Sequence, residues 1–385
     1  MAIVMVSCGE ASGDLYAGAL ARALQAQAPG TRVIGFGGER LAAAGAELSG
    51  DYRGIAVTGL TEVLRVLPRT YAMYRRLVDL ARTARPDVFV AIDFPDFNFR
   101  LASAVHALGI PVVYYVSPQL WAWRPGRIRA LKAFADKVLP IFPFEVEIYE
   151  RAGVPVEFVG HPLIDLISVT TPRDSLLRSV GLDPAAPVVA LLPGSRPNEV
   201  RALLPVLAGA MTRIRAGHPG TQFVLARAPS LSASLFDPLG PGAGGVAIIE
   251  GRTDDVLNAS DVVLTASGTA TVQTALHEKP MVILYKLSPL TYRLGRPFVK
   301  VDTFGMANLI AGRQIVPELI QDDCTPERVA GEALALLNDR SRADRMRADL
   351  RAVRAKLGAP GASGRAAAAV LNVATEAQRT QRLRE

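Results

Sequence analysis

One local pattern opens both halves of the chain: a short apolar strand, a loop of small residues, and a helix. It reads VSCGEASGDLYAGALARAL over residues 6–24 and VVALLPGSRPNEVRALLPVLAGAM over residues 188–211. A buried strand that turns through glycine and serine into a helix is the first part of a parallel β-α-β unit. The repeat of this opening predicts two successive Rossmann-like domains.

Further apolar runs alternate with helical stretches, as expected for strands that helices cover on both faces. The predicted strands are 33–36, 88–92, 112–116, 137–142 and 156–159 in the first half, and 222–226, 247–249, 262–265 and 281–285 in the second. The predicted fold class is therefore α/β, with two facing Rossmann-like domains. Ligands of such domains bind at the carboxyl ends of the strands, so we expect the active site in the cleft between the domains.

Residues 167–187 contain several prolines and threonines and resemble a linker. We therefore expect an N-terminal domain over residues 1–168 and a second domain over residues 186–350. Helices over residues 351–385 are expected to pack back on the first domain or against a partner subunit. Asn198 is a plausible N-cap of the helix that opens the second domain.

Composition narrows the possible functions. Half of the 385 residues are hydrophobic, and the two cysteines and four scattered histidines form no disulfide framework or metal-binding spacing. The net charge of +7 permits anionic partners, but no basic run with interleaved aromatic residues indicates nucleic-acid binding. Neither a signal peptide nor a transmembrane run is visible, so we expect a soluble chain or one that lies on a membrane.

The first loop combines a helix start with two carboxylates. Gly9, Ser12 and Gly13 suit a close approach to phosphate, whereas Glu10 and Asp14 would repel it. The two acids instead suit contacts with hydroxyl groups or with backbone amides.

A second loop of the first half, IDFPDFN over residues 92–98, begins where a predicted strand ends. Asp93 stands at the position where α/β enzymes place reactive groups, and Asp96 and Asn98 follow it. A carboxylate there can take a proton from a hydroxyl group. Capping of the next helix by Asp93 or Asp96 is the alternative.

Two further features of the first half have both a functional and a structural interpretation. Ser117 and Trp121 lie in YYVSPQLWAWRPGR, where aromatic faces beside arginines could bind a sugar or an acyl chain, or could pack in the core. His161 lies in VGHP and could belong to the site or serve as a buried structural histidine.

The second half contains two loops suited to anions. Gly194, Ser195 and Arg196 follow one strand, and Ser267, Gly268 and Thr269 follow another, just before a helix that carries Gln273. Backbone amides, a helix dipole and a guanidinium group together favour phosphate. Neither loop is a Walker P-loop, and neither opening contains the dinucleotide pattern GxGxxG.

A helix predicted around residues 57–82 has an apolar face and a basic face, and Pro68 is expected to kink or split it. The apolar face includes Leu60, Val63, Leu64 and Leu67, and the basic face includes Arg65 and Arg69. Such a helix can meet anionic lipid, or it can simply pack on its own sheet.

Seven of these stretches occur in a specific order: GEASGDL, IDFPDFN, YVSPQLWAWRPGR, GHPLID, LLPGSRPNEV, SGTAT and NLIAGR. Together they resemble the lipid-A-disaccharide synthase family of inverting glycosyltransferases, from about residue 4 to about residue 320. The resemblance implies a glycosyltransferase-B (GT-B) fold. It also implies transfer of a sugar from UDP-2,3-diacylglucosamine to 2,3-diacylglucosamine 1-phosphate (lipid X), without a metal or other cofactor. A peripheral position on the cytoplasmic face of the inner membrane and a homodimer are further implications.

The resemblance also assigns roles. It implies that Asp93 is the general base, that the first loop meets the acceptor, that the two loops of the second half hold UDP, and that Asn308 lies near the phosphates. At position 273 the family usually has a carboxylate that binds ribose hydroxyls, and this chain has glutamine. Another UDP-N-acetylglucosamine-dependent transferase or epimerase, and a non-catalytic sugar-nucleotide-binding module, remain as alternatives.

Overall fold

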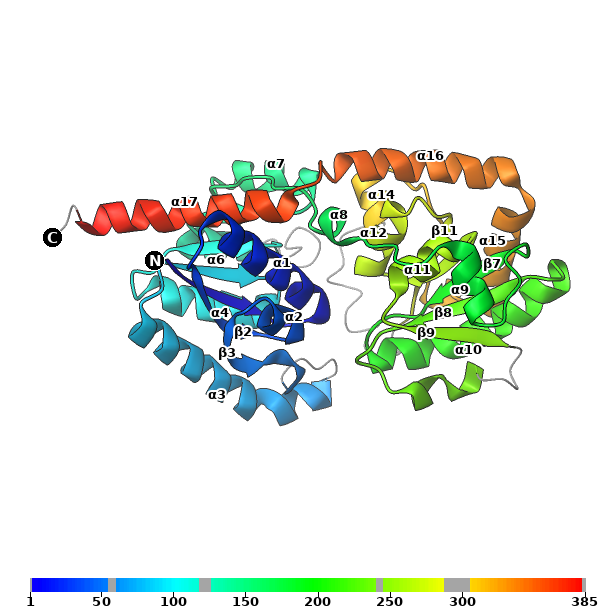
Figure 1. The fold of residues 1–385 in the computed structure, drawn as a ribbon, viewed down its shortest axis with the longest axis horizontal. Coiled ribbons are helices and arrows are strands. Elements are labelled where there is room, and N and C mark those ends of the chain that lie inside the picture. The colour runs from blue at the N-terminus through cyan, green and yellow to red at the C-terminus, as the bar shows by residue number, and fades with distance from the viewer. Residues whose placement is uncertain (1, 55–59, 118–125, 240–244, 287–304, 383–385) are drawn as a thin grey trace. The chain divides into compact units, whose positions relative to one another are not determined.

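The computed structural model describes residues 2–54, 60–117, 126–239, 245–286 and 305–382, with side chains left out at 54, 60–66 and 380–382 (Figure 1). The chain divides into two compact units. The first comprises Met1–Leu166 together with Leu357–Glu385, and the second comprises Ile167–Lys356. The chain therefore passes from one unit to the other twice.

The first unit is built on a six-stranded, fully parallel sheet in the order β3-β2-β1-β4-β5-β6. Its strands are β1 (Ile3–Cys8), β2 (Arg32–Gly37), β3 (Glu47–Asp51), β4 (Val88–Ile92), β5 (Val112–Tyr115) and β6 (Lys137–Leu139). The prediction of a strand at 156–159 is wrong. This segment makes only one isolated bridge, between Val156 and Val138, so it does not extend the sheet.

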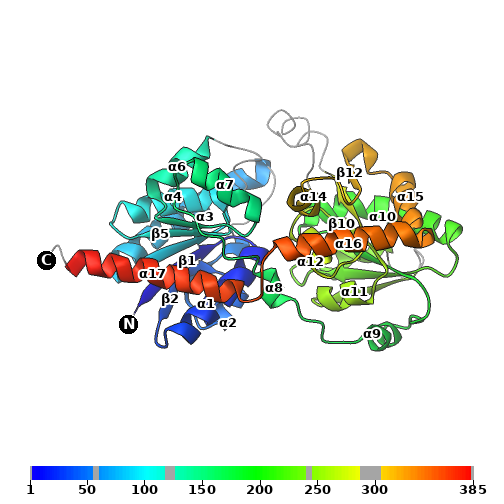
Figure 2. The same cartoon turned by 90° about the horizontal axis from the view of Figure 1, so that it is seen from above.

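Helices cover both faces of the first sheet. They are α1 (Ala11–Gln27), α2 (Glu39–Ala43), α3 (Leu60–Ala84), α4 (Pro95–His106), α6 (Arg127–Phe134), α7 (Pro143–Arg151), α8 (Leu163–Leu166) and α17 (Ala362–Arg382), with a 3-10 turn, η1, at Tyr52–Gly54. The last helix, α17, packs along α1 on one face (Figure 2), and α3 and α4 lie on the other. Helix α3 is continuous through Pro68, so Pro68 does not split it.

The second unit repeats the plan with a parallel sheet in the order β12-β11-β10-β7-β8-β9. Its strands are β7 (Val188–Leu192), β8 (Gln222–Arg227), β9 (Val246–Glu250), β10 (Val262–Ala266), β11 (Met281–Tyr285) and β12 (Glu318–Ile320). Its helices are α9 (Arg173–Ser179), α10 (Pro197–Gly217), α11 (Thr253–Ala259), α12 (Thr269–Leu276), α14 (Met306–Ala311), α15 (Pro326–Asn338) and α16 (Arg340–Lys356), with 3-10 turns η2 (Ala233–Leu239) and η5 (Gln321–Asp323).

Helix α10 begins earlier than the sequence predicts. Its N-cap is Arg196, and Pro197 takes the first helical position, so the prediction of Asn198 as N-cap is wrong. The fixed φ angle and missing N–H of proline suit that first position, and this preference decides where the helix begins.

Counted within each unit, the two sheets share the strand order 3-2-1-4-5-6 of a Rossmann domain. The direction of winding reverses between the first and fourth strands, and the loops that leave the carboxyl ends of these two strands diverge there. Ligands of open α/β sheets bind at this point. It lies between β1 and β4 in the first unit and between β7 and β10 in the second.

Candidate functional site

The carboxyl edge of the first sheet contains strained residues that are not glycine. Asp93 and Phe94 after β4 have φ angles of 46° and 50°, and Val116 after β5 has a φ angle of 55°. Side chains with a Cβ atom rarely adopt this left-handed region, least of all β-branched valine. Such conformations persist only where the surrounding structure enforces them, and they are enriched at active sites.

Neighbouring groups hold the backbone of Asp93 in place. Its carbonyl oxygen accepts hydrogen bonds from Tyr114 Oη at 2.8 Å and from Asn98 Nδ2 at 2.9 Å. Its N–H donates to the carbonyl of Tyr115 at 3.3 Å. Burial, and then the negative charge of Asp93, raise the pKa of Tyr114 well above its ordinary value, so this phenol keeps its proton and remains a donor. The sequence pattern did not single out Tyr114.

Asn98 joins the ends of β1 and β4. The residue is fully buried; its Oδ1 accepts from Ser7 Oγ at 2.7 Å, and its Nδ2 also lies 3.1 Å from the Ser7 carbonyl and 3.2 Å from the Ile92 carbonyl. Both ends of its amide are thus engaged within the protein. Asn98 supports the Asp93 loop through these bonds.

Gly9 brings the first loop against the second. A Cβ atom at this position would lie 2.1 Å from the ring of Phe94, so only glycine leaves room for that ring. The Phe94 ring in turn contacts Phe97, with 5.3 Å between the ring centroids. The predicted acceptor loop and the loop of Asp93 therefore form one packed unit.

Asp14 is buried and orders the backbone. Its carboxylate accepts hydrogen bonds from the N–H groups of Gly38, Arg40 and Leu41 at 2.8–3.1 Å, at the start of α2. This geometry favours the backbone-ordering alternative over a contact with a substrate hydroxyl group.

The remaining residues of the first loop lie at the start of α1. Glu10 is the half-buried N-cap residue, Ser12 is half-buried in the first turn, and Gly13 is buried beside the end of β4. Glu10 and Ser12 are thus the polar side chains of this loop that solvent reaches.

His161 has the environment of a structural residue. Its ring packs against Tyr16 and Phe142, with centroid distances of 6.0 Å and 5.4 Å, and its Nδ1 accepts from the N–H of Leu163 at 3.2 Å. Burial lowers its pKa to about 3, so the ring is neutral at physiological pH. Ser117 is also buried, just after the strained Val116.

Asp96 lies on the surface of the same edge. Its exposed carboxylate pairs with Arg127 at 2.6 Å, and the Arg127 guanidinium lies 5.6 Å from the centroid of the Phe99 ring. Trp121, the aromatic candidate, lies outside the described residues.

In the second unit, the PGSR loop turns through glycine. Gly194 has a φ angle of 110°, Ser195 is exposed, and Arg196 forms the N-cap of α10. The Arg196 side chain is 40% exposed and its Nη1 lies 3.1 Å from Glu199 Oε1. A partly exposed guanidinium group beside a helix start is well placed to exchange a carboxylate for a phosphate.

The SGT loop after β10 is the more open of the two. Gly268 has a φ angle of 134° and is exposed, and apart from its two chain neighbours no described residue has an atom within 4 Å of the position of a Cβ atom there. Half-buried Ser267 precedes it, and exposed Thr269 starts α12. A ligand can therefore approach the backbone closely at this loop.

Gln273 lies on α12, one turn after Thr269. Its Nε2 donates to Asp254 Oδ1 at 2.7 Å, and His277 Nε2 lies 2.8 Å from the same oxygen. The sequence pattern singled out neither Asp254 nor a role for His277.

Asn308, in α14, is buried and fully engaged. Its Oδ1 accepts from the N–H groups of Ile315 and Val316, and its Nδ2 donates to the Val316 carbonyl and to Glu318 Oε1 at 2.6 Å. Asn308 thus fixes the turn before β12. Because its amide is already hydrogen-bonded within the protein, it could affect a bound phosphate only indirectly, by holding this turn.

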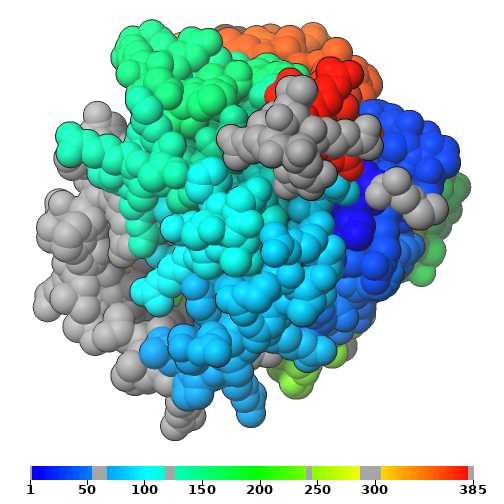
Figure 3. Space-filling view, turned by 90° about the vertical axis from the view of Figure 1, so that its left-hand side faces the viewer, coloured from blue at the N-terminus to red at the C-terminus, as the bar shows by residue number. Residues whose placement is uncertain are grey.

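Helix α3 exposes large apolar side chains. Leu67 is 55% exposed and Tyr71 is 61% exposed, and Arg69 between them is exposed too. Figure 3 shows the light-blue atoms of α3 on the surface of the first unit. Leu60, Val63, Leu64 and Arg65 lie on the same helix, but their side chains are outside the described set. Among the described residues, no helix is long and apolar enough to cross a membrane.

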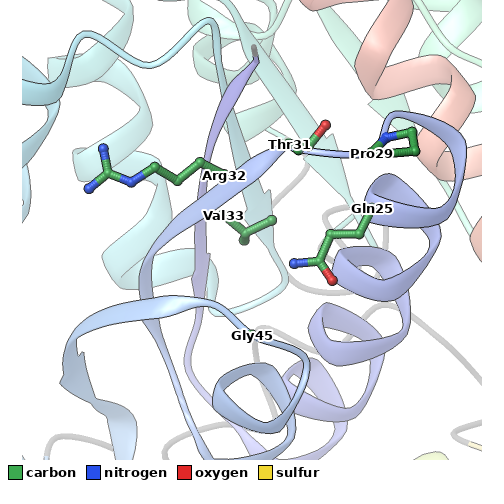
Figure 4. Close-up of a pocket in the computed structure, with 7 residues that line it drawn as sticks. Gln25, Pro29, Thr31, Arg32, Val33 and Gly45 are labelled. Carbon is green, nitrogen blue, oxygen red and sulfur yellow. The ribbon is translucent and has the colours of Figure 1, made fainter.

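A surface depression lies at the opposite edge of the first sheet, beside the start of β2. Gln25, Pro29, Thr31, Val33 and Gly45 line it, and Arg32, which pairs with Glu47, also borders it (Figure 4). It is remote from the carboxyl ends of the strands. In the described part of the chain, no group of three or more His, Cys, Asp or Glu residues could hold a metal ion.

Comparison with known proteins finds relatives over almost the whole chain. A family model described as "Lipid-A-disaccharide synthetase" matches residues 4–373. The lipid-A-disaccharide synthase of Geobacter sulfurreducens is 43% identical over 374 residues, which cover 96% of this chain and 97% of that protein.

Among solved structures, UDP-GlcNAc 2-epimerase from Neisseria meningitidis, bound to UDP-GlcNAc, matches with a TM-score of 0.69 at 15% identity, covering 97% of this chain and all of that one. The glycosyltransferase of kitacinnamycin matches with a TM-score of 0.64 at 19% identity, covering 96% and 98%. At such identities these two likenesses establish the fold alone.

Proposed function

The chain belongs to the lipid-A-disaccharide synthase family, and from this premise we propose how its two sheet edges share the reaction. It is a glycosyltransferase that forms the lipid A disaccharide, built from two Rossmann-like domains of the GT-B architecture. We assign UDP-2,3-diacylglucosamine as the donor and lipid X as the acceptor. The 6-hydroxyl oxygen of lipid X attacks C1 of the donor sugar, the bond from C1 to the diphosphate breaks, and UDP leaves with inversion at C1.

Asp93 takes the proton from the attacking hydroxyl group. The observation that carries this assignment is the left-handed backbone of Asp93 at the reversal point of the first sheet, held by Tyr114, Asn98 and Tyr115. A carboxylate on a backbone that is held in place needs less reorganisation as the proton moves, and general-base catalysis contributes about 10²–10⁴ in rate.

UDP binds at the second unit, on the PGSR and SGT loops. The N-terminus of α10, the backbone at the open Gly268 and the guanidinium of Arg196 can together stabilise the charge that develops on the departing diphosphate. Arg196 would then leave Glu199 for the diphosphate. No step of this scheme passes through a metal ion.

Both substrates carry acyl chains, and the exposed face of α3 suits the surface of the membrane that contains them. Leu67 and Tyr71 can enter the headgroup region while Arg69 meets anionic lipid. We therefore place the enzyme peripherally on the cytoplasmic face of the inner membrane. Co-sedimentation with vesicles of phosphatidylglycerol tests this: Leu67→Ser/Tyr71→Ser should bind several-fold more weakly, and equal binding would refute the docking role.

We propose that the enzyme is a homodimer, as the resemblance to the family implies. In the structure, α17 packs on α1 of its own chain. Sedimentation equilibrium gives the mass of the assembly directly.

The decisive experiment combines donor and acceptor and follows UDP release. Asp93→Asn should lower kcat by about 10³ because it removes the base, while UDP binding measured by calorimetry stays unchanged. Asp174→Asn, a surface variant on α9, is the matched control and should keep full activity. An Asp93→Asn enzyme with wild-type kcat would refute the assignment of the base.

The same assay tests the alternatives. An epimerase would convert UDP-N-acetylglucosamine without any acceptor, and a binding module would bind UDP without releasing it from a donor. UDP release that requires both acylated substrates excludes both.

A further inference from the structure

A compact polar cluster lies beside the SGT loop of the second unit. Asp254, the second residue of α11, accepts hydrogen bonds on Oδ1 from Gln273 Nε2 at 2.7 Å and His277 Nε2 at 2.8 Å. Its Oδ2 accepts from the N–H of Ser168 at 3.1 Å. The side chains of Asp254 and His277 are only 16% and 7% exposed.

The charge of Asp254 fixes the orientation of its partners. Burial opposes ionisation, but hydrogen bonds from His277, Gln273 and the Ser168 N–H outweigh it and lower the pKa of Asp254. An ionised carboxylate only accepts hydrogen bonds, so His277 must present its Nε2–H and Gln273 must turn its NH₂ group toward Asp254. The amide oxygen of Gln273 is then directed away from the carboxylate.

Gln273 is positioned to use that oxygen. It is half-buried while Thr271, Val272 and Thr274 around it are buried, and it lies four residues after exposed Thr269, on the same face of α12. Among the described residues, none donates a hydrogen bond to its Oε1. The acceptor is therefore available on the half-buried face of α12 that also carries Thr269.

We propose that Asp254 is a positioning residue for the nucleotide donor: it locks the amide of Gln273 so that Oε1 accepts a hydrogen bond from a hydroxyl group of the nucleotide. This inference rests on the proposed binding of UDP at the second unit. It also explains why position 273 is neutral in this chain. A glutamate there would put a second negative charge about 3 Å from Asp254, and one of the two would have to take up a proton.

The two positions should consequently be coupled. In Asp254→Asn, the introduced amide can either donate or accept, so Gln273 is no longer held in one orientation, and UDP affinity should fall about 5–10-fold, the effect of one hydrogen bond. The donor KM should rise by a similar factor, with kcat within about twofold. Gln273→Glu should weaken UDP binding at least as much, through repulsion by Asp254.

The double variant distinguishes positioning from simple damage. In Asp254→Asn/Gln273→Glu, the amide introduced on α11 can donate to the carboxylate introduced on α12, so UDP affinity should return to within about threefold of wild type. Two losses that merely add would overturn the proposal, as would an Asp254→Asn enzyme with unchanged UDP affinity.

Asp255→Asn is the matched control. Asp255 is the next residue of α11, and its hydrogen bonds within the described residues go to Thr170, Thr171 and Arg252 and not to Gln273. This variant should lower the Tm and leave UDP affinity unchanged. If it weakened UDP binding as much as Asp254→Asn, the effect would be one of stability and the proposal would fail. A wild-type protein that bound no UDP would refute the proposed function itself, whereas normal binding with uncoupled variants would refute only the positioning role.

Discussion

The two sheets have the same strand order, yet loops at their carboxyl edges differ in construction. In the first unit, the turns after β4 and β5 place aspartate, phenylalanine and valine in left-handed conformations, and the buried side chains of Asn98 and Tyr114 hold the Asp93 carbonyl. In the second unit, the turns after β7 and β10 use glycine, and the described residues leave the space around Gly268 open. The first edge, the filled edge, holds a strained backbone in place through hydrogen bonds. The second, the open edge, leaves backbone accessible to a ligand.

The largest expected effect on stability concerns the filled edge of the first unit. Asn98→Ala removes the amide that binds the carbonyls of Ser7, Ile92 and Asp93, so it should lower the free energy of unfolding by about 3 kcal/mol. Urea denaturation measures the loss, and Asn198→Ala, an exposed position, should change stability by at most about 0.5 kcal/mol. Equal values for the two variants would mean that the first edge is not held by its buried amide.

The next largest effect is expected at the open edge of the second unit. Arg196→Ala should weaken UDP binding about 30-fold, since it removes a charge-assisted contact, with little change in Tm because the side chain is partly exposed. Arg201→Ala, one turn further along α10, is the control and should bind UDP normally. Similar UDP affinities for the two variants would show that the diphosphate does not bind at the PGSR loop.

The dependence of stability on pH tests the first unit through His161. The pKa of His161 is about 3 in the folded first unit and near 6.5 when unfolded, so the unfolded state takes up the proton first as the pH falls. The contribution of neutral His161 to the free energy of unfolding is complete above about pH 6.5. About 2 kcal/mol of stability should therefore be lost between pH 7 and pH 5.

The variant His161→Gln shows how much of that loss belongs to the histidine. Urea denaturation at the two pH values should give a decrease that is about 2 kcal/mol smaller for the variant than for the wild type. An identical decrease in both proteins would contradict the neutral, buried state of His161.

The smallest effect concerns glycine in the open edge. Gly268→Ala meets no steric obstacle among the described residues but must adopt a φ angle of 134°, which should cost about 1–2 kcal/mol of stability and reduce UDP affinity several-fold. Gly126→Ala has an ordinary φ angle and no steric obstacle within the described part of the chain, and should be neutral in both assays. A stable, fully binding Gly268→Ala protein would show that the open edge does not need glycine.

The sequence predicted what depends on local pattern. Continuous apolar runs identified most strands, and the small-residue loops identified both reversal points. The short edge strands β3 and β12 have weaker patterns and were not among the predicted strands. The strand predicted at 156–159 failed because an apolar run next to an edge strand need not pair beyond one bridge.

The features of the site that the sequence did not predict depend on partners that are distant in the chain. Asp14 binds N–H groups more than 20 residues away, Asn98 binds Ser7 across 91 residues, and Asp254 reaches both Ser168 and His277. Spacing in the sequence indicates which polar residues stand at the right edge, but not whether tertiary contacts already use their hydrogen-bonding groups.

The first unit consists of two segments that are far apart in the chain, and this has a consequence for biosynthesis. Helix α17 supplies buried residues against α1 and a hydrogen bond from Gln378 to Asp87, yet it is translated after all of residues 167–356. At about 5–20 residues per second, the ribosome needs roughly 10–40 s to reach it. A nascent first unit therefore waits with one face of its sheet incompletely covered, and a chaperone that shields apolar surface would find its target there.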